Sequence, residues 1–232
     1  MKKGNKTVLL FDLDGTLLDS APDLAAAINE MLISLSLKVF SQEVIRGWVG
    51  NGAKTLVERA LSHSINNQSE NRKFSEAEIN NALAIFLTYY QQKLCVESVL
   101  YNGVKKTLLA LKKQGYRLAI ITNKPTIFIA PIIASYNLTD LFELQLGGDS
   151  LKERKPHPLP LLHACKVLNV STEECIMIGD SKNDILAAKA ANMQSIGLTY
   201  GYNYGEDINT HKPDWCLDTF PELIPLLDKV FS

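Results

Sequence analysis

The sequence predicts an α/β fold in which helices flank a parallel β-sheet and a separate all-helical domain is inserted. Two observations support this fold class. Along residues 95–232, short apolar runs without helical periodicity alternate with amphipathic segments, which is typical of βα units. Residues 21–94, by contrast, contain several helical patterns and no convincing strand. With 232 residues, 46% of them hydrophobic, the chain is long enough for one large domain or two small ones.

Five segments are expected to form the strands of the sheet. The first, residues 7–13, contains four consecutive apolar residues and therefore predicts a buried strand. Similar runs follow at residues 117–122, 144–148, 175–180 and 194–199.

Three amphipathic segments are expected to form helices of the sheet-bearing part. Residues 102–115 carry apolar residues at helical spacing and end at Gly115, a natural helix end. Pro158 is expected to open the second helix. Its apolar face would contain Leu161, Leu162 and Cys165. Residues 221–231 are expected to form a final short helix.

The inserted region is expected to contain three or more helices. Two of them would begin at Ser20 and Ser75, where S-x-x-D and S-x-x-E are typical of capping boxes, and the polar residues 66–75 would form a loop. Two crossings of the chain would join this insert to the rest, which implies a second small domain. We therefore expect a core domain of residues 1–17 and 95–232 and a helical cap domain of residues 18–94.

The composition argues against several functional classes. The chain has 24 basic and 25 acidic residues, so no overall basic excess favours nucleic acid or an acidic membrane surface. The first apolar run is too short for a secretory signal, and no run approaches a membrane span. Four widely spaced cysteines without a C-x-x-C pair indicate reduced thiols. We expect a cytoplasmic protein with no obligate protein partner.

Asp12 and Asp14 come at the end of the first apolar run. The Asp14-Gly15 pair could form a hairpin turn, but the following residues lead into a helix start and leave too little room for a second strand. A calcium-binding loop needs glycine at its sixth position, where this chain has Leu17. Residues i and i+2 of a strand share a face, so both carboxylates should lie side by side. Unpaired carboxylates there are costly unless a cation or a reaction uses them.

Asp180 ends another predicted strand and supplies a third carboxylate. The carboxyl ends of parallel strands meet at one edge of a sheet, so Asp12, Asp14 and Asp180 should converge on a site suited to Mg²⁺. Asp184 has two interpretations, because it could cap a helix with Ser181 or support the metal site from behind. One residue could do both.

Thr122, Asn123 and Lys155 also fall just after predicted strands or in the loops beside them. Singly, each has a structural explanation, since a threonine at a strand end is commonly a turn residue and a lysine in a Pro-rich loop is commonly solvated. Their order along the chain, together with the aspartates, favours a common site.

This series of motifs resembles the haloacid dehalogenase superfamily. The matching segments are "DLDGT" (12–16), "ITN" (121–123), Lys155 in "KPHP" and "GDSKND" (179–184). The resemblance covers nearly the whole chain and implies a Rossmann-like core with a helical cap inserted after the first motif. Within the superfamily, the chain is most similar to bacterial phosphatases of 2-phosphoglycolate. A phosphatase or mutase acting on another small phosphoester, such as a sugar phosphate, is the alternative.

The resemblance implies a Mg²⁺-dependent hydrolysis through an aspartyl phosphate. Asp12 would be the nucleophile and Asp14 the general acid and base, with Asp12, Asp180 and the backbone carbonyl of Asp14 holding the metal. The phosphoryl group would be held by Thr122, Lys155 and the backbone amides of Leu13 and Asn123. The second carboxylate, Asp14, disfavours a dehalogenase, which has no need for it.

The cap is expected to select the substrate. Arg46 and Lys54, with the amides of a turn containing Gly47, Gly50 and Gly52, could receive a substrate carboxylate. Alternatively, Arg46 and Lys54 are solvated helix charges.

Two other functional classes fit the sequence less well. An acceptor aspartate at residue 12 disfavours a phospho-accepting signalling domain, and the complete catalytic set disfavours a non-catalytic binding module.

Overall fold

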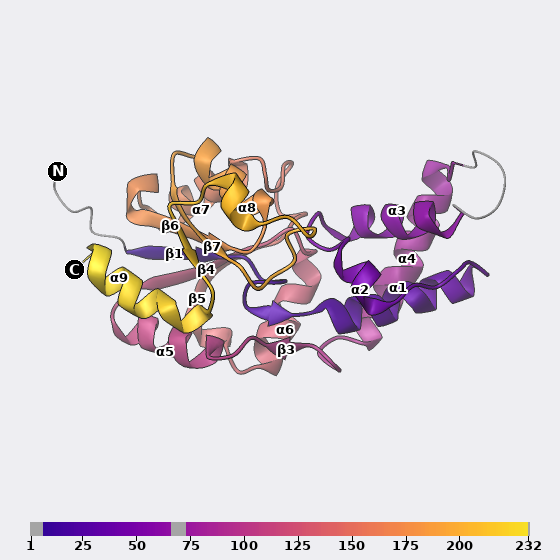
Figure 1. Cartoon of the computed structure of the whole chain (residues 1–232), viewed down its shortest axis with the longest axis horizontal. Helices are drawn as coiled ribbons and strands as arrows, with labels where there is room; N and C mark the ends of the chain where they lie inside the picture. The colour runs from indigo at the N-terminus through magenta and orange to yellow at the C-terminus, as the bar shows by residue number, and fades with distance from the viewer. Residues whose placement is uncertain (1–6, 66–72, 232) are drawn as a thin grey trace.

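The computed structural model describes residues 7–65 and 73–231, so most of the predicted 66–75 loop lies outside the described residues. At one end of the molecule a β-sheet is packed between helices, and at the other end lie the four helices that the described part of the insert forms (Figure 1). The first strand, β1 (Val8–Phe11), is central in the sheet.

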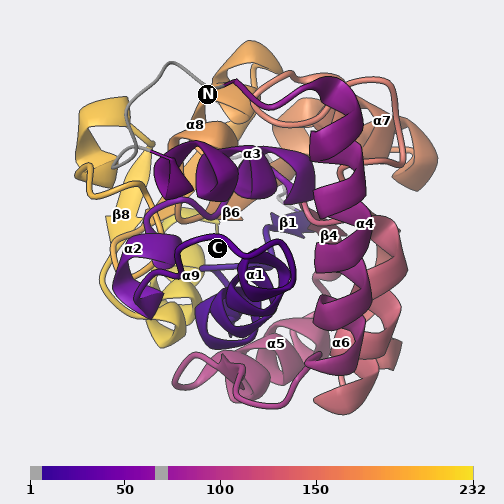
Figure 2. The same ribbon diagram turned by 90° about the vertical axis from the view of Figure 1, so that its right-hand side faces the viewer.

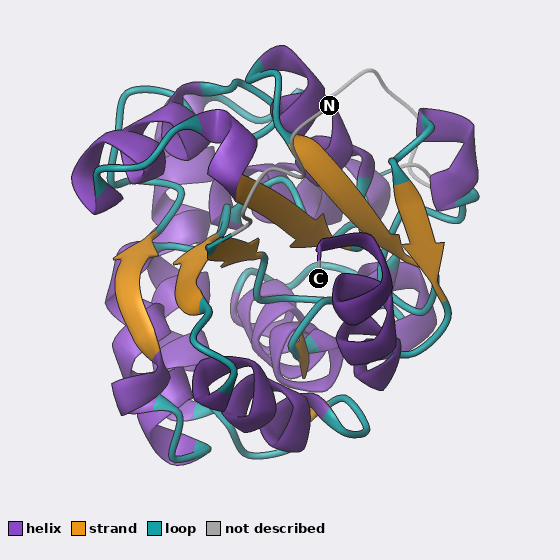
Figure 3. Ribbon diagram, turned by 90° about the vertical axis from the view of Figure 1, so that its left-hand side faces the viewer, coloured by secondary structure: helices purple, strands orange, loops and turns teal. Residues whose placement is uncertain are grey.

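The main sheet has six strands in the order β5-β4-β1-β6-β7-β8, and every neighbouring pair is parallel. Beyond β1 its strands are β4 (Arg117–Ile121), β5 (Phe142–Leu146), β6 (Cys175–Gly179), β7 (Gln194–Leu198) and β8 (Trp215–Leu217). All five predicted strands are confirmed, with small shifts at their ends (Figure 3). Strand order reverses at β1, since the chain adds β4 and β5 on one side and β6 to β8 on the other, and ligands collect at such a switch point.

Alternate residues of β1 face opposite layers of helices. Leu9 and Phe11 pack in a core with α5 (Val104–Lys113), α6 (Ile129–Ser135) and α9 (Leu223–Phe231). Val8 and Leu10 pack in a second core with α7 (Leu159–Leu168) and α8 (Lys182–Ala190). The two layers are separate in Figure 1, with α7 and α8 above the sheet and α5, α6 and α9 below it.

The predicted helices are confirmed, with one correction on α7. Leu161 and Cys165 are buried as expected, but Leu162 is 42% exposed. The buried stripe of α7 continues through Ala164 and Leu168 instead, which is the i, i+3, i+4, i+7 spacing from Leu161. Leu162 is one position, and therefore about 100°, away from that stripe.

The insert is helical, and its described part contains no strand between residues 21 and 94. It consists of α1 (Ala21–Ser34), α2 (Gln42–Arg46), α3 (Ala53–Ser64) and α4 (Glu76–Gln92), which we call the cap. Ser75 and Glu78 form the predicted capping box at the start of α4. Ser20 does not cap α1; its hydroxyl donates to Asp14 Oδ1 at 2.6 Å instead.

The two crossings between core and cap pair with each other. β2 (Leu18–Asp19) and β3 (Val99–Leu100) form a short antiparallel ladder that the sequence did not reveal. The proposed domain boundaries, after residues 17 and 94, lie at or shortly before these strands. None of the helices in the described ranges is long and apolar enough to span a bilayer.

Candidate active site

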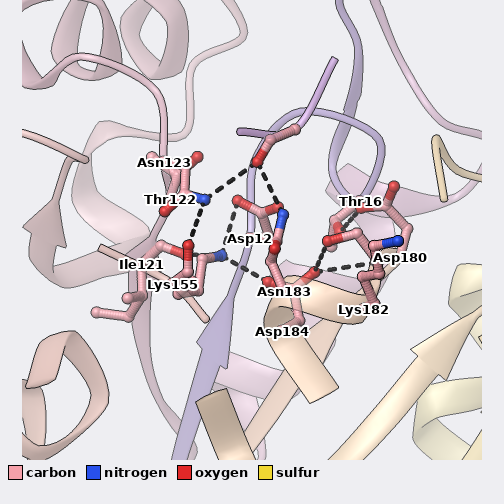
Figure 4. Close-up of polar contacts among 12 residues, drawn as sticks. Asp12, Thr16, Ile121, Thr122, Asn123, Lys155, Asp180, Lys182, Asn183 and Asp184 are labelled. Carbon is pink, nitrogen blue, oxygen red and sulfur yellow. Dashed lines mark hydrogen bonds and ion pairs between the residues drawn. The ribbon is translucent and has the colours of Figure 1, made fainter. Parts of the chain in front are cut away.

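Three adjacent strands bring the predicted residues to one edge of the sheet. Phe11 of β1 is in register with Ile120 of β4 and Ile178 of β6, so the residues that follow these strands lie at the same level. The Asp12 amide extends this register, because it donates to the Ile178 carbonyl at 3.0 Å. Figure 4 shows Asp12 between the β4 side, with Thr122 and Asn123, and the β6 side, with Asp180 and Asp184.

Three buried carboxylates form a possible metal centre. Asp12, Asp180 and Asp184 each offer an oxygen, and these three atoms lie within 4.8 Å of one another. This corrects the expected trio of side chains in one member, because the Asp14 carboxylate is not in the group. It accepts instead from Ser20 Oγ at 2.6 Å and from Lys124 Nζ at 2.9 Å. A contribution from Asp14 through its backbone carbonyl, as the resemblance implied, remains a proposal.

The electrostatics of the trio fit a divalent cation. Burial raises the pKa of Asp12 to about 6, against a lowering effect of Lys155, and burial together with the negative charge of Asp12 raises the pKa of Asp180 well above its ordinary value. The group thus holds more negative charge than Lys155 alone offsets. Oxygen ligands in a compact, negatively charged setting suit Mg²⁺ or a similar hard cation.

The backbone packs tightly around Asp180 and fixes its orientation. Asp180 Oδ1 accepts from Thr16 Oγ1 at 2.6 Å, and Oδ2 accepts from the Tyr202 amide at 2.7 Å. Gly15 has a φ of +87°, and a Cβ there would lie 2.2 Å from Asp180 Oδ2. A Cβ on Gly201 would lie 2.2 Å from Asp180 Cβ. Both positions therefore require glycine for the close approach of the chain to this carboxylate.

Lys155 is buried among acids rather than solvated. Its ammonium lies 3.1 Å from Asp12 Oδ1 and 2.6 Å from Asp184 Oδ1, and it also donates to the Ile121 carbonyl. Asp184 Oδ2 accepts from the Ser181 amide at 3.1 Å and from its hydroxyl at 3.0 Å, which confirms the helix-cap interpretation. Asp184 therefore caps α8 with one oxygen and faces Lys155 with the other.

Thr122 and Asn123 are buried at the end of β4. A hydrogen bond from Thr122 lowers the pKa of Asp12, opposing the effect of burial. Asn123 Nδ2 donates to the Lys155 carbonyl at 2.9 Å and to the Gly50 carbonyl at 3.1 Å. Asn123 thus connects two core loops to the glycine-containing turn of the cap.

Sequence reasoning missed two residues at this site. Lys124 is buried, and its ammonium donates to both oxygens of Asp14, at 2.9 and 3.0 Å, and to the hydroxyl of Tyr90 at 2.6 Å. Its position directly after Asn123 was an available signal, because it places a lysine at the same sheet edge as two aspartates. Tyr90 lies in α4, where its helical pattern predicts only a core position.

A pocket between core and cap opens onto Asp12 and Asp14. Viewed from the cap end, the cap helices lie in front of β1 and β4 (Figure 2). The pocket is lined by Asp12, Asp14, Leu24, Val49, Gly50, Gly52, Ala53, Leu56, Phe86, Tyr90, Thr122, Asn123, Lys124, Pro125 and Phe128. Its polar groups come almost entirely from the core, and its apolar walls mainly from the cap.

Of the predicted cap residues, Gly50 and Gly52 line this pocket, whereas Arg46, Gly47 and Lys54 do not. Arg46 Nη2 pairs with Asp19 Oδ2 at 2.6 Å, and its guanidinium lies 5.0 Å from the ring centre of Tyr202. Lys54 pairs with Glu76 on the surface. Both cations are already engaged elsewhere, so the geometry gives neither a role in holding a substrate in this pocket.

Comparison with known proteins gives a consistent result. A family model described as haloacid dehalogenase-like hydrolase matches residues 9–198. A phosphoglycolate phosphatase of Colwellia psychrerythraea is 61% identical, covering 97% of this chain and 98% of that protein. One of Psychrobacter arcticus is 44% identical, with 98% of each chain covered. A crystal structure described as a predicted phosphoglycolate phosphatase from Haemophilus somnus superposes with a TM-score of 0.91, at 41% identity over 97% of this chain and 99% of the other. The similarity therefore extends over both the sheet and the inserted helices.

Proposed function

Because this chain belongs to the haloacid dehalogenase-like hydrolases, we propose that it is a cytoplasmic phosphatase that hydrolyses 2-phosphoglycolate to glycolate and phosphate. The observation that carries the proposal is the buried group of Asp12, Asp180 and Asp184. Asp12 also lines a pocket with mainly apolar walls and a few polar groups, which is the usual composition of a binding site for a small molecule. The names of relatives that match over nearly their full length support the substrate.

Mg²⁺ is the proposed cofactor, held by Asp12, Asp180 and the Asp14 backbone carbonyl, where its charge offsets the repulsion between an anionic phosphate and Asp12. Asp184 supports this centre by holding Lys155 beside Asp12. The donor set fits, since these ligands are oxygens and those of Asp12 and Asp180 are buried.

Asp12 is the proposed nucleophile. One of its carboxylate oxygens attacks phosphorus, the bond from phosphorus to the ester oxygen breaks, and glycolate leaves. Asp14 gives its proton to the departing oxygen. It then takes a proton from the water that attacks the aspartyl phosphate, which releases orthophosphate and restores Asp12. The Ser20 hydroxyl and Lys124 ammonium hold the Asp14 side chain in place for both transfers.

The remaining residues hold the phosphoryl group. Thr122, Lys155 and the backbone amides of Leu13 and Asn123 are the proposed contacts with its oxygens, and Lys155 offsets charge as the ester bond breaks. Lys155 is suited to this: burial acts to lower its pKa, but the negative charges of Asp12 and Asp184 outweigh burial and hold the pKa above the ordinary lysine value.

The nucleophile is tested by Asp12→Asn. The amide has nearly the same shape but cannot attack phosphorus, so orthophosphate release from 2-phosphoglycolate with Mg²⁺ should fall by at least about 10³-fold. The circular dichroism spectrum should not change. Substantial remaining turnover would exclude Asp12 as nucleophile.

The substrate is tested separately, with a panel of phosphoesters that includes sugar phosphates and nucleotides. A clear preference for a sugar phosphate would favour the alternative phosphatase or mutase.

A further inference from the structure

The pocket that opens onto Asp12 and Asp14 is lined by a single positively charged side chain among the described residues. Among its lining side chains in the described residues, the charged ones are Asp12, Asp14 and Lys124. The walls that the cap contributes are mainly apolar and include Leu24, Leu56 and Phe86. An anionic group of a substrate that lies beyond the phosphate therefore meets one cation, Lys124, and the mainly apolar surface of the cap.

Lys124 and Tyr90 form a pair of neighbouring donors. Lys124 comes from the end of β4 and Tyr90 from α4, and their nitrogen and oxygen lie 2.6 Å apart, comparable to the spacing of the two oxygens in a carboxylate. In this contact Tyr90 accepts from Lys124, so the tyrosine hydrogen is not used there. Among the described residues the tyrosine hydroxyl makes no other hydrogen bond. A carboxylate can accept from the Tyr90 hydroxyl with one oxygen and from the Lys124 ammonium with the other.

The reach of this pair matches a very short substrate. Asp14, the proposed acid for the ester oxygen, is in direct contact with Lys124 at 2.9 and 3.0 Å. A carboxylate separated from the ester oxygen by one methylene group therefore lies beside Lys124 when that oxygen faces Asp14. A longer linker would carry the carboxylate past the ammonium and against the apolar side chains of the cap, where it has no partner.

We propose that Lys124 and Tyr90 bind the carboxylate of a two-carbon phosphoester and are the specificity-determining residues of this enzyme. The inference rests on the proposed function, since it requires 2-phosphoglycolate to be the substrate. One donor belongs to the core and the other to the cap, so the carboxylate is fully bound only when the two are in the arrangement seen here.

The test compares 2-phosphoglycolate with ethyl phosphate, which has the same chain length but a methyl group in place of the carboxylate. Lys124→Met removes the charge and keeps the approximate shape. We expect its kcat/KM for 2-phosphoglycolate to fall about 10- to 150-fold more than that for ethyl phosphate, the range of a hydrogen bond to a charged group. Equal losses on both substrates would overturn the proposal, because they would show that Lys124 acts only through Asp14.

Tyr90→Phe provides an independent variant, which removes one hydroxyl and leaves the ring and the pair of Lys124 with Asp14 in place. It should lower kcat/KM for 2-phosphoglycolate several-fold more than for ethyl phosphate; equal effects would overturn the proposal even if Lys124→Met fails to fold. Lys112→Met, which loses a surface pair with Glu143, is the matched control and should change neither substrate. If the unmodified enzyme does not prefer 2-phosphoglycolate, the proposed function fails. If that preference exists but survives both variants, only this inference fails.

Discussion

At the scale of single residues, Gly15 determines how closely the turn after β1 approaches the metal centre. Its φ of +87° is in the left-handed region, and its missing side chain leaves room for Asp180 Oδ2. Gly115 offers a matched comparison, because its φ is +93° and a Cβ there would meet nothing within 4 Å. The two glycines share a backbone conformation and differ in their surroundings.

Gly15→Ala is therefore expected to cost more than Gly115→Ala. The control carries only the left-handed strain of an alanine, about 1–2 kcal/mol of unfolding free energy. Gly15→Ala adds the displacement of Asp180, about 1–3 kcal/mol more by analogy with overpacked cores. It should also raise the Mg²⁺ concentration needed for half-maximal activity. Urea denaturation and a Mg²⁺ titration measure both effects, and similar behaviour of the two variants would contradict this interpretation of Gly15.

Lys155 is expected to be essential for stability as well as activity. It is the buried cation between Asp12 and Asp184, and Lys155→Met leaves those carboxylates without their common partner. Breaking a buried pair in this way costs about 3–5 kcal/mol. Urea denaturation without metal measures the loss. Lys182→Met, which loses a pair with Glu206 near the surface and a contact with the ring of Tyr204, should cost less than about 1 kcal/mol. If both lysines prove equally dispensable, the buried network does not stabilise the fold.

The sequence predicted these residues unevenly, for physical reasons. Asp12, Thr122 and Asp180 could be found because each follows an apolar run and the ends of parallel strands meet. The direction of the Asp14 side chain could not be predicted, since the chain turns after Phe11 and no longer follows the alternation of a strand. The contact of Tyr90 with Lys124 could not be predicted from the sequence, because it depends on how the cap lies against the core.

At the scale of elements, the two crossings between core and cap are held by polar contacts. Asp23 in α1 accepts from the backbone amides of Glu97 and Ser98, at 2.8 and 3.2 Å, which joins the start of the cap to the second crossing. On the first crossing, Asp19 pairs with Arg46 of α2. These contacts position the cap irrespective of what the pocket contains.

Arg46→Ala is accordingly expected to affect all substrates alike. The loss of the Asp19 pair loosens α2 from the crossing, so kcat/KM for 2-phosphoglycolate and for ethyl phosphate should fall by the same factor, within about twofold. Lys54→Ala removes an exposed pair and should change neither value appreciably. Steady-state kinetics on the two substrates decide this. A selective loss on 2-phosphoglycolate would restore Arg46 as a substrate contact.

Periodicity predicted the long elements and could not predict the short ones. Four of the five apolar runs bury consecutive side chains, and the amphipathic helices bury one at each turn, which leaves a pattern in the sequence. β2 and β3 have two residues each, too few for alternation to be visible. β8 is a half-buried strand at the edge of the sheet, and its three residues are too few to identify a strand.

At the scale of the whole molecule, the net charge conceals a strong local imbalance. The chain as a whole carries a formal charge of -1, yet Asp12, Asp180 and Asp184 are gathered in one buried site. Because burial raises the pKa of Asp12 to about 6, this carboxyl binds more protons in the metal-free folded protein than in the unfolded chain between about pH 4 and 6. The contribution of Asp12 to stability therefore falls as the pH rises through this window, and Asp180, whose pKa is also raised, acts in the same direction.

Mg²⁺ is expected to reverse this loss, and to do so more at neutral than at acidic pH. The ion binds ionised carboxylates, so protons compete with it below about pH 6, where Asp12 is protonated in the metal-free fold. At a hundredfold excess over its dissociation constant at pH 7.5, Mg²⁺ should raise the Tm by about 5–10 °C. At pH 5 the increase should be distinctly smaller. Thermal unfolding at both pH values, with NaCl at equal ionic strength as the control, measures the difference. Asp180→Asn should abolish the increase; an equal rise at both pH values, or an undiminished one in this variant, would show that Mg²⁺ binds elsewhere.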